Sequence, residues 1–409
     1  MAGVVIVGAG QAGSQCAASL REAGYSGPVA LISAETATPY HRPPLSKAFL
    51  KDPGVEPQPL RAERFYAEHD IELIHGVTVE TIDRPMRSVA LSDGSSRDWD
   101  KLVLATGALP RMPDMPGAGL AGVHTLRMLD DAIGLRAAAA LVQSIVVIGG
   151  GFIGMEAAFT FAGLGKKVTV VEAAPRILGR AVAPIVSSHV HERARAAGIA
   201  ILTETMPEAI EGDRKVAGVR LADGHVVAAD LVVVGIGVAP DTRLAEIAGL
   251  ACANGVSVDG RMRTSDPDIF AVGDCASFHH WQADRTVRLE SVQNATDQGR
   301  HAAHAIMGSE AGFHAVPWFW SDQGDMKLQM VGLSFDPDRF LVSGNPEQNA
   351  FAVYHFAGDR LIAIDTVNRP ADHMLGRKFI EAGFTPSDDD ILEGPARLKL
   401  LFKDLRRAG

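Results

Sequence analysis

The chain has 409 residues with 39 Lys and Arg against 49 Asp and Glu, which gives a formal net charge of −10. This acidic balance argues against a protein that binds nucleic acid over its whole surface, although a local basic patch is compatible with it. The length predicts two or three domains, and a composition that is 47% hydrophobic and 22% charged is typical of a globular protein with buried cores.

The N-terminal sequence and the cysteines exclude several further classes. The first basic residue is Arg21, so no secretory signal peptide is predicted. Cys16, Cys252 and Cys275 form no C-x-x-C pair and no iron–sulfur spacing, so neither a redox dithiol nor a cluster is expected. We expect reduced, mostly buried thiols and a cytoplasmic location. The uncharged, glycine-containing stretch 137–155 predicts a strand, a turn and a helix, not a membrane span.

The first predicted elements are a buried strand over residues 4–7, a glycine-rich turn and a helix that ends at Gly24. The turn has the pattern G-x-G-x-x-G, with Gly8, Gly10 and Gly13. The first glycine permits a tight turn, the second lets the backbone approach a pyrophosphate, and the third lets the helix pack on the strand. A second strand over residues 29–33 leads to Glu35, a candidate ligand for ribose hydroxyls.

The same pattern recurs 141 residues later, between a predicted strand over residues 145–148 and a helix that ends at Gly165. Its glycines are Gly149, Gly151 and Gly154. A further strand over residues 168–171 leads to Glu172, whose carboxylate would repel a 2′-phosphate and so favours NAD over NADP. Two dinucleotide sites in one chain suggest hydride transfer between a nicotinamide and a flavin. Because no dithiol is expected, the electrons must pass to an acceptor outside the chain.

Six further motifs follow in the sequence. They are 39–47 (P-Y-H-R-P-P-L-S-K), 102–107 (L-V-L-A-T-G), 232–237 (V-V-V-G-I-G), 264–274 (T-S-D-P-D-I-F-A-V-G-D), 290–294 (E-S-V-Q-N) and 317–323 (P-W-F-W-S-D-Q). Together with the two glycine turns, they resemble the pyridine nucleotide-disulfide oxidoreductase superfamily. More narrowly, they resemble the FAD-dependent ferredoxin reductases of bacterial cytochrome P450 and Rieske oxygenase systems. The resemblance covers nearly the whole chain.

The resemblance implies a glutathione-reductase-like α/β fold, with two Rossmann-like dinucleotide-binding domains and a C-terminal α+β domain. The expected spans are 1–108 with 243–312 for the FAD domain, 109–242 for the NAD domain and 313–409 for the C-terminal domain. Alternating stretches at 340–343 and 351–356 predict an antiparallel sheet in the last part. The basic segment 397–407 predicts an amphipathic helix, which we expect to pack on the domain, with membrane or partner binding as the alternative.

The resemblance also implies which residues bind FAD. The expected set is Gly8, Gly10, Ala12, Gly13, Glu35, Arg42, Pro43, Lys47, Val79, Ala105, Thr106, Gly107, Arg127, Asp274, Val292 and Trp320. Relatives often carry an acid at the position of Ala34, so the assignment of the ribose ligand to Glu35 is open by one residue. Trp318 is expected to pack in the core, and Trp320 either to do the same or to lie beside the isoalloxazine. The helix after Ser291 would direct its positive end toward the flavin.

The NAD site and the catalytic pair are implied in the same way. The residues expected to bind NAD are Gly149, Gly151, Phe152, Ile153, Gly154, Glu156, Glu172 and Gly237. Lys47 is expected near the flavin N5, and Glu156 near both Lys47 and the nicotinamide, so these two are the candidate catalytic residues. A charged hydrogen bond between them would orient the nicotinamide. The alternative for Glu156 is an exposed glutamate that the helix dipole favours.

The predicted activity is hydride transfer from NADH to FAD, followed by single-electron transfer to a [2Fe–2S] ferredoxin that serves a P450 or Rieske oxygenase. An acidic ferredoxin requires a local basic area, for which Arg300 and Lys327 are candidates. No metal site and no nucleic-acid or membrane partner is expected, and the chain is expected to be a monomer or a weak dimer. The alternatives are a flavin reductase with another acceptor, such as rubredoxin, a quinone-like or ascorbyl compound or oxygen, and a redox-gated interaction protein.

Overall fold

The computed structural model describes residues 2–408, which divide into two compact units. Unit 1 comprises the chain up to His41 together with Gln58–Leu109 and Ala239–Pro317, and unit 2 comprises Arg42–Pro57, Pro110–Val238 and the chain from Trp318. The strands β7 (Ala108–Pro110) and β16 (Val238–Pro240) carry the chain out of unit 1 and back into it.

Unit 1 is built on a seven-stranded sheet in the order β3-β2-β1-β6-β5-β4, with β19 paired to β6. Its strands are β1 (Gly3–Val7), β2 (Val29–Ile32), β3 (Ile71–Ile74), β4 (Val79–Asp83), β5 (Ser88–Leu91), β6 (Ser96–Leu104) and β19 (Ile269–Ala271). The strands β1, β2, β3, β6 and β19 run parallel, and β4 and β5 add an antiparallel hairpin. Alternate residues of β1 enter different cores, Ile6 on one face and Val7 on the other, so the sheet is covered on both faces, as predicted.

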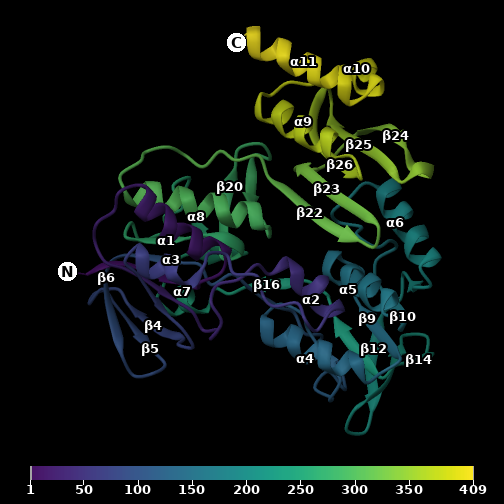
Figure 1. Ribbon diagram of the computed structural model, residues 1–409, viewed down its shortest axis with the longest axis horizontal. Coiled ribbons are helices and arrows are strands. Elements are labelled where there is room, and N and C mark those ends of the chain that lie inside the picture. Colours follow the sequence, from purple (N-terminus) through teal and green to yellow (C-terminus); the bar gives the residue numbers. More distant parts are fainter. Residues whose placement is uncertain (1, 409) are drawn as a thin grey trace. The chain divides into compact units, whose positions relative to one another are not determined.

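Two helices of unit 1, α1 (Gln11–Glu22) and α8 (Val292–Ile306), lie side by side in Figure 1. They approach closely at Gly299, where a Cβ atom would lie only 2.4 Å from the Ala12 carbonyl oxygen. The other elements of unit 1 are α3 (Glu63–Glu68), α7 (Arg243–Ile247), the short helix η2 (Gly273–Cys275) and a four-stranded sheet of β17 (Cys252–Ala253), β18 (Gly255–Val258), β20 (Ala276–His280) and β21 (Arg285–Val287).

Unit 2 contains the second parallel sheet, in the order β11-β10-β9-β15-β8. Its strands are β8 (Val123–His124), β9 (Ser144–Ile148), β10 (Lys167–Val171), β11 (Ala200–Leu202) and β15 (Leu231–Val234). The helices of this part are η1 (Pro43–Ser46), α2 (Ala48–Lys51), α4 (Leu129–Ala140), α5 (Phe152–Gly163) and α6 (Pro184–Ala196), and β12 (Pro207–Gly212), β13 (Val216–Leu221) and β14 (Val226–Ala228) form an antiparallel sheet. In the uncharged stretch 137–155, the predicted strand, turn and helix are present as β9, the glycine turn and the start of α5, but its first residues form the end of α4, which was not predicted. Within the described residues, no helix has the length and apolar character of a membrane span.

The C-terminal part of unit 2 is an antiparallel sheet in the order β22-β23-β26-β25-β24, which confirms the predicted strand type. Its elements are β22 (Trp318–Gln323), β23 (Met326–Gly332), β24 (Arg339–Asn345), η3 (Pro346–Gln348), β25 (Ala350–Ala357), β26 (Arg360–Val367), α9 (Pro370–Glu381), α10 (Asp388–Glu393) and α11 (Pro395–Ala408). This sheet shares one hydrophobic core with the parallel sheet of unit 2, because Met326 and Phe351 belong to the same buried cluster as Phe161 and Val170.

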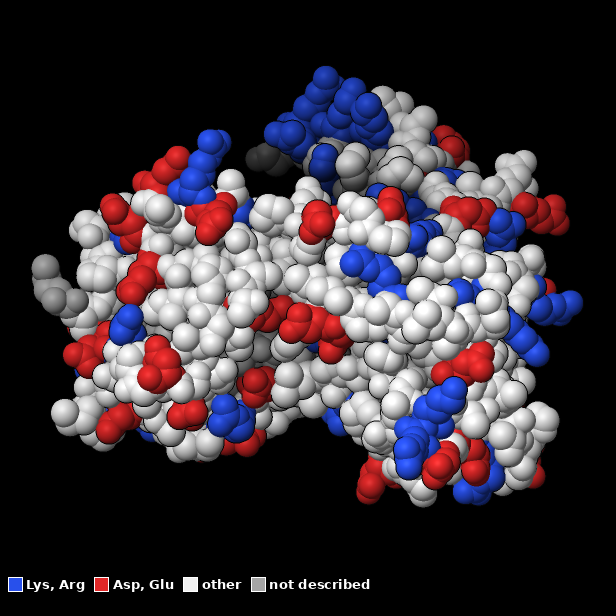
Figure 2. All heavy atoms as spheres, turned by 60° about the horizontal axis from the view of Figure 1, so that its bottom comes forward, with Lys and Arg blue, Asp and Glu red and all other residues white. Residues whose placement is uncertain are grey.

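The terminal helix α11 is amphipathic and packs on its own domain, as expected. Leu398 is fully buried, and the Phe402 ring lies 6.0 Å from that of Phe379 on α9. Its polar side carries a group of exposed basic residues, and Figure 2 shows Lys and Arg side chains gathered at this end of the chain. These residues are Lys399, Lys403, Arg406 and Arg407.

Candidate active site

The two glycine-rich turns have the same backbone geometry. Gly8 and Gly149 have φ angles of +103° and +105°, in the region that favours glycine. A Cβ on Gly13 would lie 1.9 Å from the Gly8 carbonyl oxygen, and a Cβ on Gly154 would lie 2.1 Å from the Gly149 carbonyl oxygen. Both turns therefore require glycine at the first and third positions, for the reasons that the motif predicts.

The middle glycines leave open space at the start of each helix. Gly10 and Gly151 are the N-caps of α1 and α5, and neither helix has a side-chain cap or an acidic residue in its first turn. A Cβ at Gly10 would meet nothing within 4 Å, and one at Gly151 only a backbone oxygen at 3.9 Å. Unpaired N–H groups and the positive end of a helix dipole thus face free space, which fits the pyrophosphate of a dinucleotide in each unit.

An acidic side chain follows the second strand of each turn. The Glu172 carboxylate accepts hydrogen bonds from the backbone N–H of Gly150 at 2.6 Å and of Ala174 at 2.7 Å. In unit 1, Glu35 accepts a hydrogen bond from the Tyr40 hydroxyl at 2.5 Å. Tyr40 was not singled out in the sequence, although it lies within the 39–47 motif. The Glu172 carboxylate is thus held beside its turn, which is the position that ribose recognition requires.

Further predicted FAD residues of unit 1 gather around the start of α1. A Cβ on Gly273 would lie 3.0 Å from that of Ala12, so η2 with Asp274 lies directly beside this helix. The buried Gln298 side chain accepts a hydrogen bond from the Gly273 N–H at 2.7 Å and holds η2 there. A Cβ on Gly8 would lie 2.3 Å from the Ala105 oxygen, which brings the 102–107 motif to the same turn.

The remaining predicted FAD residues of unit 1 differ in which of their groups could contact a ligand. The Thr106 hydroxyl donates a hydrogen bond to the Asp241 carbonyl at 2.7 Å, and Gly107 has a φ angle of +74°. Val292 begins α8, whose N-cap Ser291 accepts a hydrogen bond from the Asn294 N–H. The side chain of Val79 is buried in a core of unit 1, so only its backbone is able to meet a ligand.

The other predicted FAD residues belong to unit 2. Arg42 lies beside Arg127 and donates a hydrogen bond to its carbonyl at 3.1 Å, while Asp131 accepts from the Arg127 N–H and fixes the start of α4. Trp318 and Trp320 on β22 are both partly buried, with ring centroids 5.6 Å apart. Pro43 begins η1.

Unit 2 contains a largely buried ion pair between Lys47 and Glu156. The Lys47 Nζ lies 2.8 Å from Glu156 Oε2, donates to the Pro43 carbonyl at 3.2 Å and lies 3.9 Å from the nearest Asp322 carboxylate oxygen. The side chain of Glu156 is 3% exposed and that of Lys47 is 20% exposed. Glu156 is therefore not an exposed glutamate at the start of a helix, because α5 directs it inward to a charged partner.

Three more groups bind Glu156, and the sequence did not single them out. The Ser46 hydroxyl donates to Oε2 at 2.5 Å, the Ser321 hydroxyl donates to Oε1 at 2.5 Å, and the Asp322 N–H donates to Oε1 at 3.3 Å. Ser46 and Ser321 are direct neighbours of Lys47 and Trp320 in two of the motifs. Motif membership was the only signal in the sequence that pointed to them.

The other predicted NAD residues line the start of α5 and the end of β15. The Phe152 ring lies 4.7 Å from that of Phe319, and Ile153 is exposed on the first turn of the helix. Gly237 has a φ angle of +101°, and a Cβ there would meet nothing within 4 Å.

The three cysteines are free thiols. Cys16 and Cys275 are fully buried, and burial raises the pKa of Cys16 to about 12 and that of Cys275 above its ordinary value. Burial also raises the pKa of the partly exposed Cys252. A thiol with a raised pKa is a poor nucleophile at neutral pH. The three cysteines thus form no disulfide, and none of them has the lowered pKa of a redox-active thiol.

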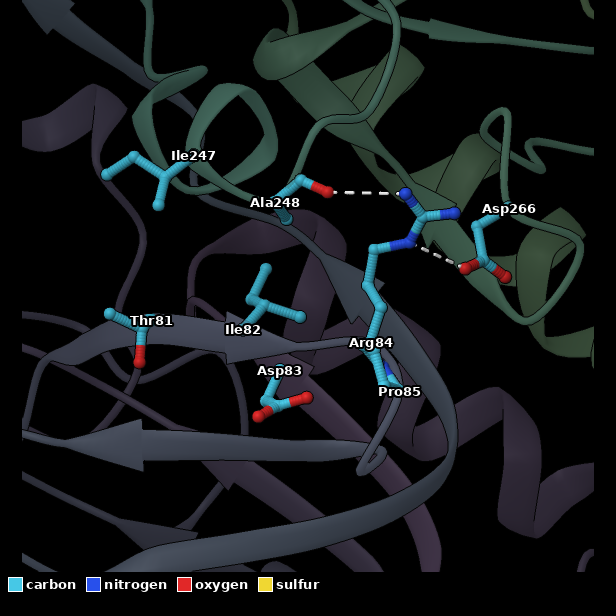
Figure 3. A pocket seen from close by; sticks show the side chains of 8 residues that line it. All are labelled: Thr81, Ile82, Asp83, Arg84, Pro85, Ile247, Ala248 and Asp266. Carbon is cyan, nitrogen blue, oxygen red and sulfur yellow. Dashed lines mark hydrogen bonds and ion pairs between the residues drawn. The ribbon is translucent and has the colours of Figure 1, made fainter.

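A separate hollow of 670 Å³ lies in unit 1 between the end of β4 and α7 (Figure 3). Arg84 crosses it and binds the Asp266 carboxylate at 2.9 Å and the Ala248 carbonyl at 3.3 Å. None of the predicted nucleotide residues lines this hollow. It is therefore distinct from the two glycine turns.

The fold and the two turns define a dinucleotide-binding oxidoreductase, and the chain belongs to the pyridine nucleotide-disulphide oxidoreductase family. The family model matches residues 2–299, and a reductase C-terminal model matches residues 318–402. The chain is 42% identical to rhodocoxin reductase of Rhodococcus erythropolis, over 98% of this chain and 96% of the relative. It is 44% identical to putidaredoxin reductase of Pseudomonas putida, over 92% of this chain and 91% of that protein.

A solved structure has nearly the same fold. The ferredoxin reductase for the CYP199A2 system of Rhodopseudomonas palustris matches with a TM-score of 0.94 and 44% identity, over 96% of this chain and 97% of that one. A rubredoxin-NAD(+) reductase of Pseudomonas putida is 41% identical over 90% of this chain and 96% of its own length. Relatives of similar identity thus carry names with different electron acceptors.

Proposed function

We propose that this protein is an NADH-dependent ferredoxin reductase that contains FAD and serves a cytochrome P450 or Rieske oxygenase. The observation that carries the proposal is the presence of two open dinucleotide turns in a chain whose three cysteines form neither a disulfide nor a C-x-x-C pair. Two such turns would bind one dinucleotide that donates hydride and one that accepts it. Without a dithiol in the chain, the electrons must then pass to an external acceptor.

When bound, FAD would supply a centre that accepts a hydride and releases single electrons. In this proposal unit 1 holds FAD through the Gly8–Gly13 turn, Glu35 and Asp274, and unit 2 holds NADH through the Gly149–Gly154 turn and Glu172. The helix N-termini would stabilise both pyrophosphates with their backbone N–H groups and dipoles. The Glu172 carboxylate repels a 2′-phosphate and selects NADH.

Lys47 and Glu156 would act as one unit. The buried carboxylate keeps the ammonium at a fixed point beside the start of α5, where the nicotinamide half of NADH would lie. Fixed placement of this kind contributes to rate because the reacting groups need not be ordered in each turnover. Glu156 thereby orients Lys47, and both orient the nicotinamide.

Ferredoxin as the acceptor rests on the ferredoxin reductases among the relatives. Rubredoxin is the second candidate, because a rubredoxin reductase is similar to nearly the same extent. For docking we propose Lys327 and Arg300, although Arg300 already pairs with Asp297 on its own helix at 3.1 Å. We also propose a cytoplasmic location and a monomer or weak dimer. A redox-gated interaction protein would instead show very slow turnover with any acceptor.

The visible spectrum of the purified protein tests the cofactor assignment. A flavin spectrum that bleaches anaerobically with one equivalent of NADH, and at much higher concentrations with NADPH, is expected. A colourless protein, or a flavin that NADH leaves oxidised, would overturn the proposal.

A further inference from the structure

We propose that Ser321 is a positioning residue that determines where Glu156 holds Lys47. The inference rests on the proposed function, because it assumes that this ion pair serves hydride transfer. It assigns to a neutral side chain of the C-terminal sheet a role in the chemistry of the NAD-binding part of unit 2.

The hydrogen bonds divide the two oxygens of Glu156 between different partners. Oε2 accepts from Ser46 and binds Lys47, whereas Oε1 accepts from Ser321 at 2.5 Å and from the Asp322 N–H at 3.3 Å. A carboxylate as buried as this one is stable only with several donors. Ser321 is the only hydroxyl on Oε1 among the described residues, and the backbone donor beside it is long.

The Ser321 hydroxyl donates its one proton to Glu156. The Gln323 side-chain amide donates to Ser321 Oγ at 2.8 Å and to the Phe152 carbonyl at 3.2 Å, so Ser321 accepts from one side and donates to the other. The Ser46 hydroxyl has a second possible acceptor, because it also lies 3.4 Å from the Pro43 carbonyl. A hydroxyl has one proton, so Ser321 is the better fixed of the two donors.

The alternative partner for Lys47 is close. Asp322 lies 3.9 Å from the ammonium, and its side chain is 44% exposed. Without the Ser321 hydroxyl, Oε1 keeps only the long backbone bond, and the carboxylate is free to rotate away from Lys47. The ammonium then shifts toward Asp322 and solvent. Ser321 thus determines which of two carboxylates Lys47 binds.

The first test compares Ser321→Ala with the matched control Ser343→Ala. Ser343 is an equally buried serine of the same sheet, and its hydroxyl donates to the Ile391 carbonyl at 2.9 Å, away from Glu156. A hydrogen bond to a charged group corresponds to about a tenfold effect. We expect Ser321→Ala to lower the limiting rate of flavin reduction by NADH about tenfold with little change in the NADH dissociation constant. Ser343→Ala should change neither value by more than about twofold. Equal rates for both variants would overturn the proposal.

A second readout needs no turnover. Limited acetylation followed by mass spectrometry reports the reactivity of Lys47, with the exposed Lys51 of α2 as an internal reference. We expect the ratio of Lys47 to Lys51 labelling to rise severalfold in Ser321→Ala and to stay at the wild-type value in Ser343→Ala. An unchanged ratio in Ser321→Ala would contradict the proposed shift of Lys47.

A double-mutant cycle shows whether Ser321 acts through Glu156. Adding Ser321→Ala to Glu156→Gln should cost less than about twofold in rate, because the group that Ser321 positions has already changed. A full tenfold additional loss would overturn the inference. If Glu156→Gln itself reduces flavin at the wild-type rate, the role of the ion pair in the proposed function fails. If Glu156→Gln is slow but Ser321→Ala is not, only the present inference fails.

Discussion

The sharpest prediction concerns the two glycines at the start of α5, which differ in what a methyl group would meet. In Gly151→Ala the new Cβ lies 3.9 Å from its nearest neighbour, and the φ angle of −76° suits alanine. In Gly154→Ala the new Cβ lies 2.1 Å from the Gly149 carbonyl oxygen, a backbone atom. Gly151→Ala should therefore weaken ligand binding, and Gly154→Ala should lower the stability of the fold.

The magnitudes follow from these contacts. Overpacking costs about 1–3 kcal/mol, and a contact with backbone belongs at the upper end of that range. The gain from alanine over glycine in a helix offsets about 1 kcal/mol. Gly154→Ala should thus lower the free energy of unfolding by about 2 kcal/mol, or Tm by roughly 4–8 °C. Gly151→Ala should leave Tm nearly unchanged but weaken NAD⁺ binding by about tenfold and at most about thirtyfold, because contact of the helix N-terminus with the pyrophosphate is worth up to about 2 kcal/mol.

Calorimetric titration with NAD⁺ and thermal unfolding measure both quantities on the same samples. Gly163→Ala is the matched control, since it lies in the same helix and its Cβ would meet nothing within 4 Å. It should leave NAD⁺ affinity unchanged and should not lower Tm, because it gains helix propensity without a steric clash. Wild-type NAD⁺ affinity in a folded Gly151→Ala variant would refute the assignment of this turn to the pyrophosphate.

Three further predictions address specificity, pH and the thiols. Glu172→Gln should reduce the preference for NADH over NADPH about tenfold, because it removes the charge that repels a 2′-phosphate; an unchanged ratio of the two dissociation constants would exclude this role. Burial first, and then Arg377, lowers the pKa of His373 to about 4. Between pH 6.5 and 4, His373 therefore binds a proton in the unfolded state but not in the native state. The free energy of unfolding falls by about 1.4 kcal/mol per pH unit as pH falls through this range. Urea titrations of His373→Gln should lack that contribution, and a slope equal to that of the wild type would contradict it. Iodoacetamide should label only Cys252 in the native protein and leave NADH oxidation intact, whereas inactivation would reveal a catalytic thiol.

The local parts of the site could be predicted from the sequence. The turns at Gly8 and Gly149 depend on residues within a few positions of one another, so the glycine spacing and the flanking apolar runs specify their shape. The ion pair between Lys47 and Glu156 came only from the resemblance, because no pattern within the chain links two residues so far apart.

The hydrogen bonds from Ser46 and Ser321 to Glu156 could not be predicted from local sequence patterns. Ser46 and Ser321 lie 110 and 165 residues from Glu156 in sequence, and only the packing of β22 and η1 on α5 brings them to it. The shared core of unit 2 has the same origin, since Val170 of β10 and Phe351 of β25 belong to separate sheets. Apolar periodicity shows that each strand is buried, but not which other sheet covers it.

The acceptor tests the central claim most directly. Protein reduced with one equivalent of NADH under anaerobic conditions is mixed in a stopped-flow instrument with a [2Fe–2S] ferredoxin or with rubredoxin, and flavin reoxidation is followed in the visible range. The account predicts rapid reoxidation by the ferredoxin, one electron at a time and slowed by added salt, and slower reoxidation by rubredoxin. Reduced flavin that persists with the ferredoxin but is rapidly reoxidised by rubredoxin would contradict it.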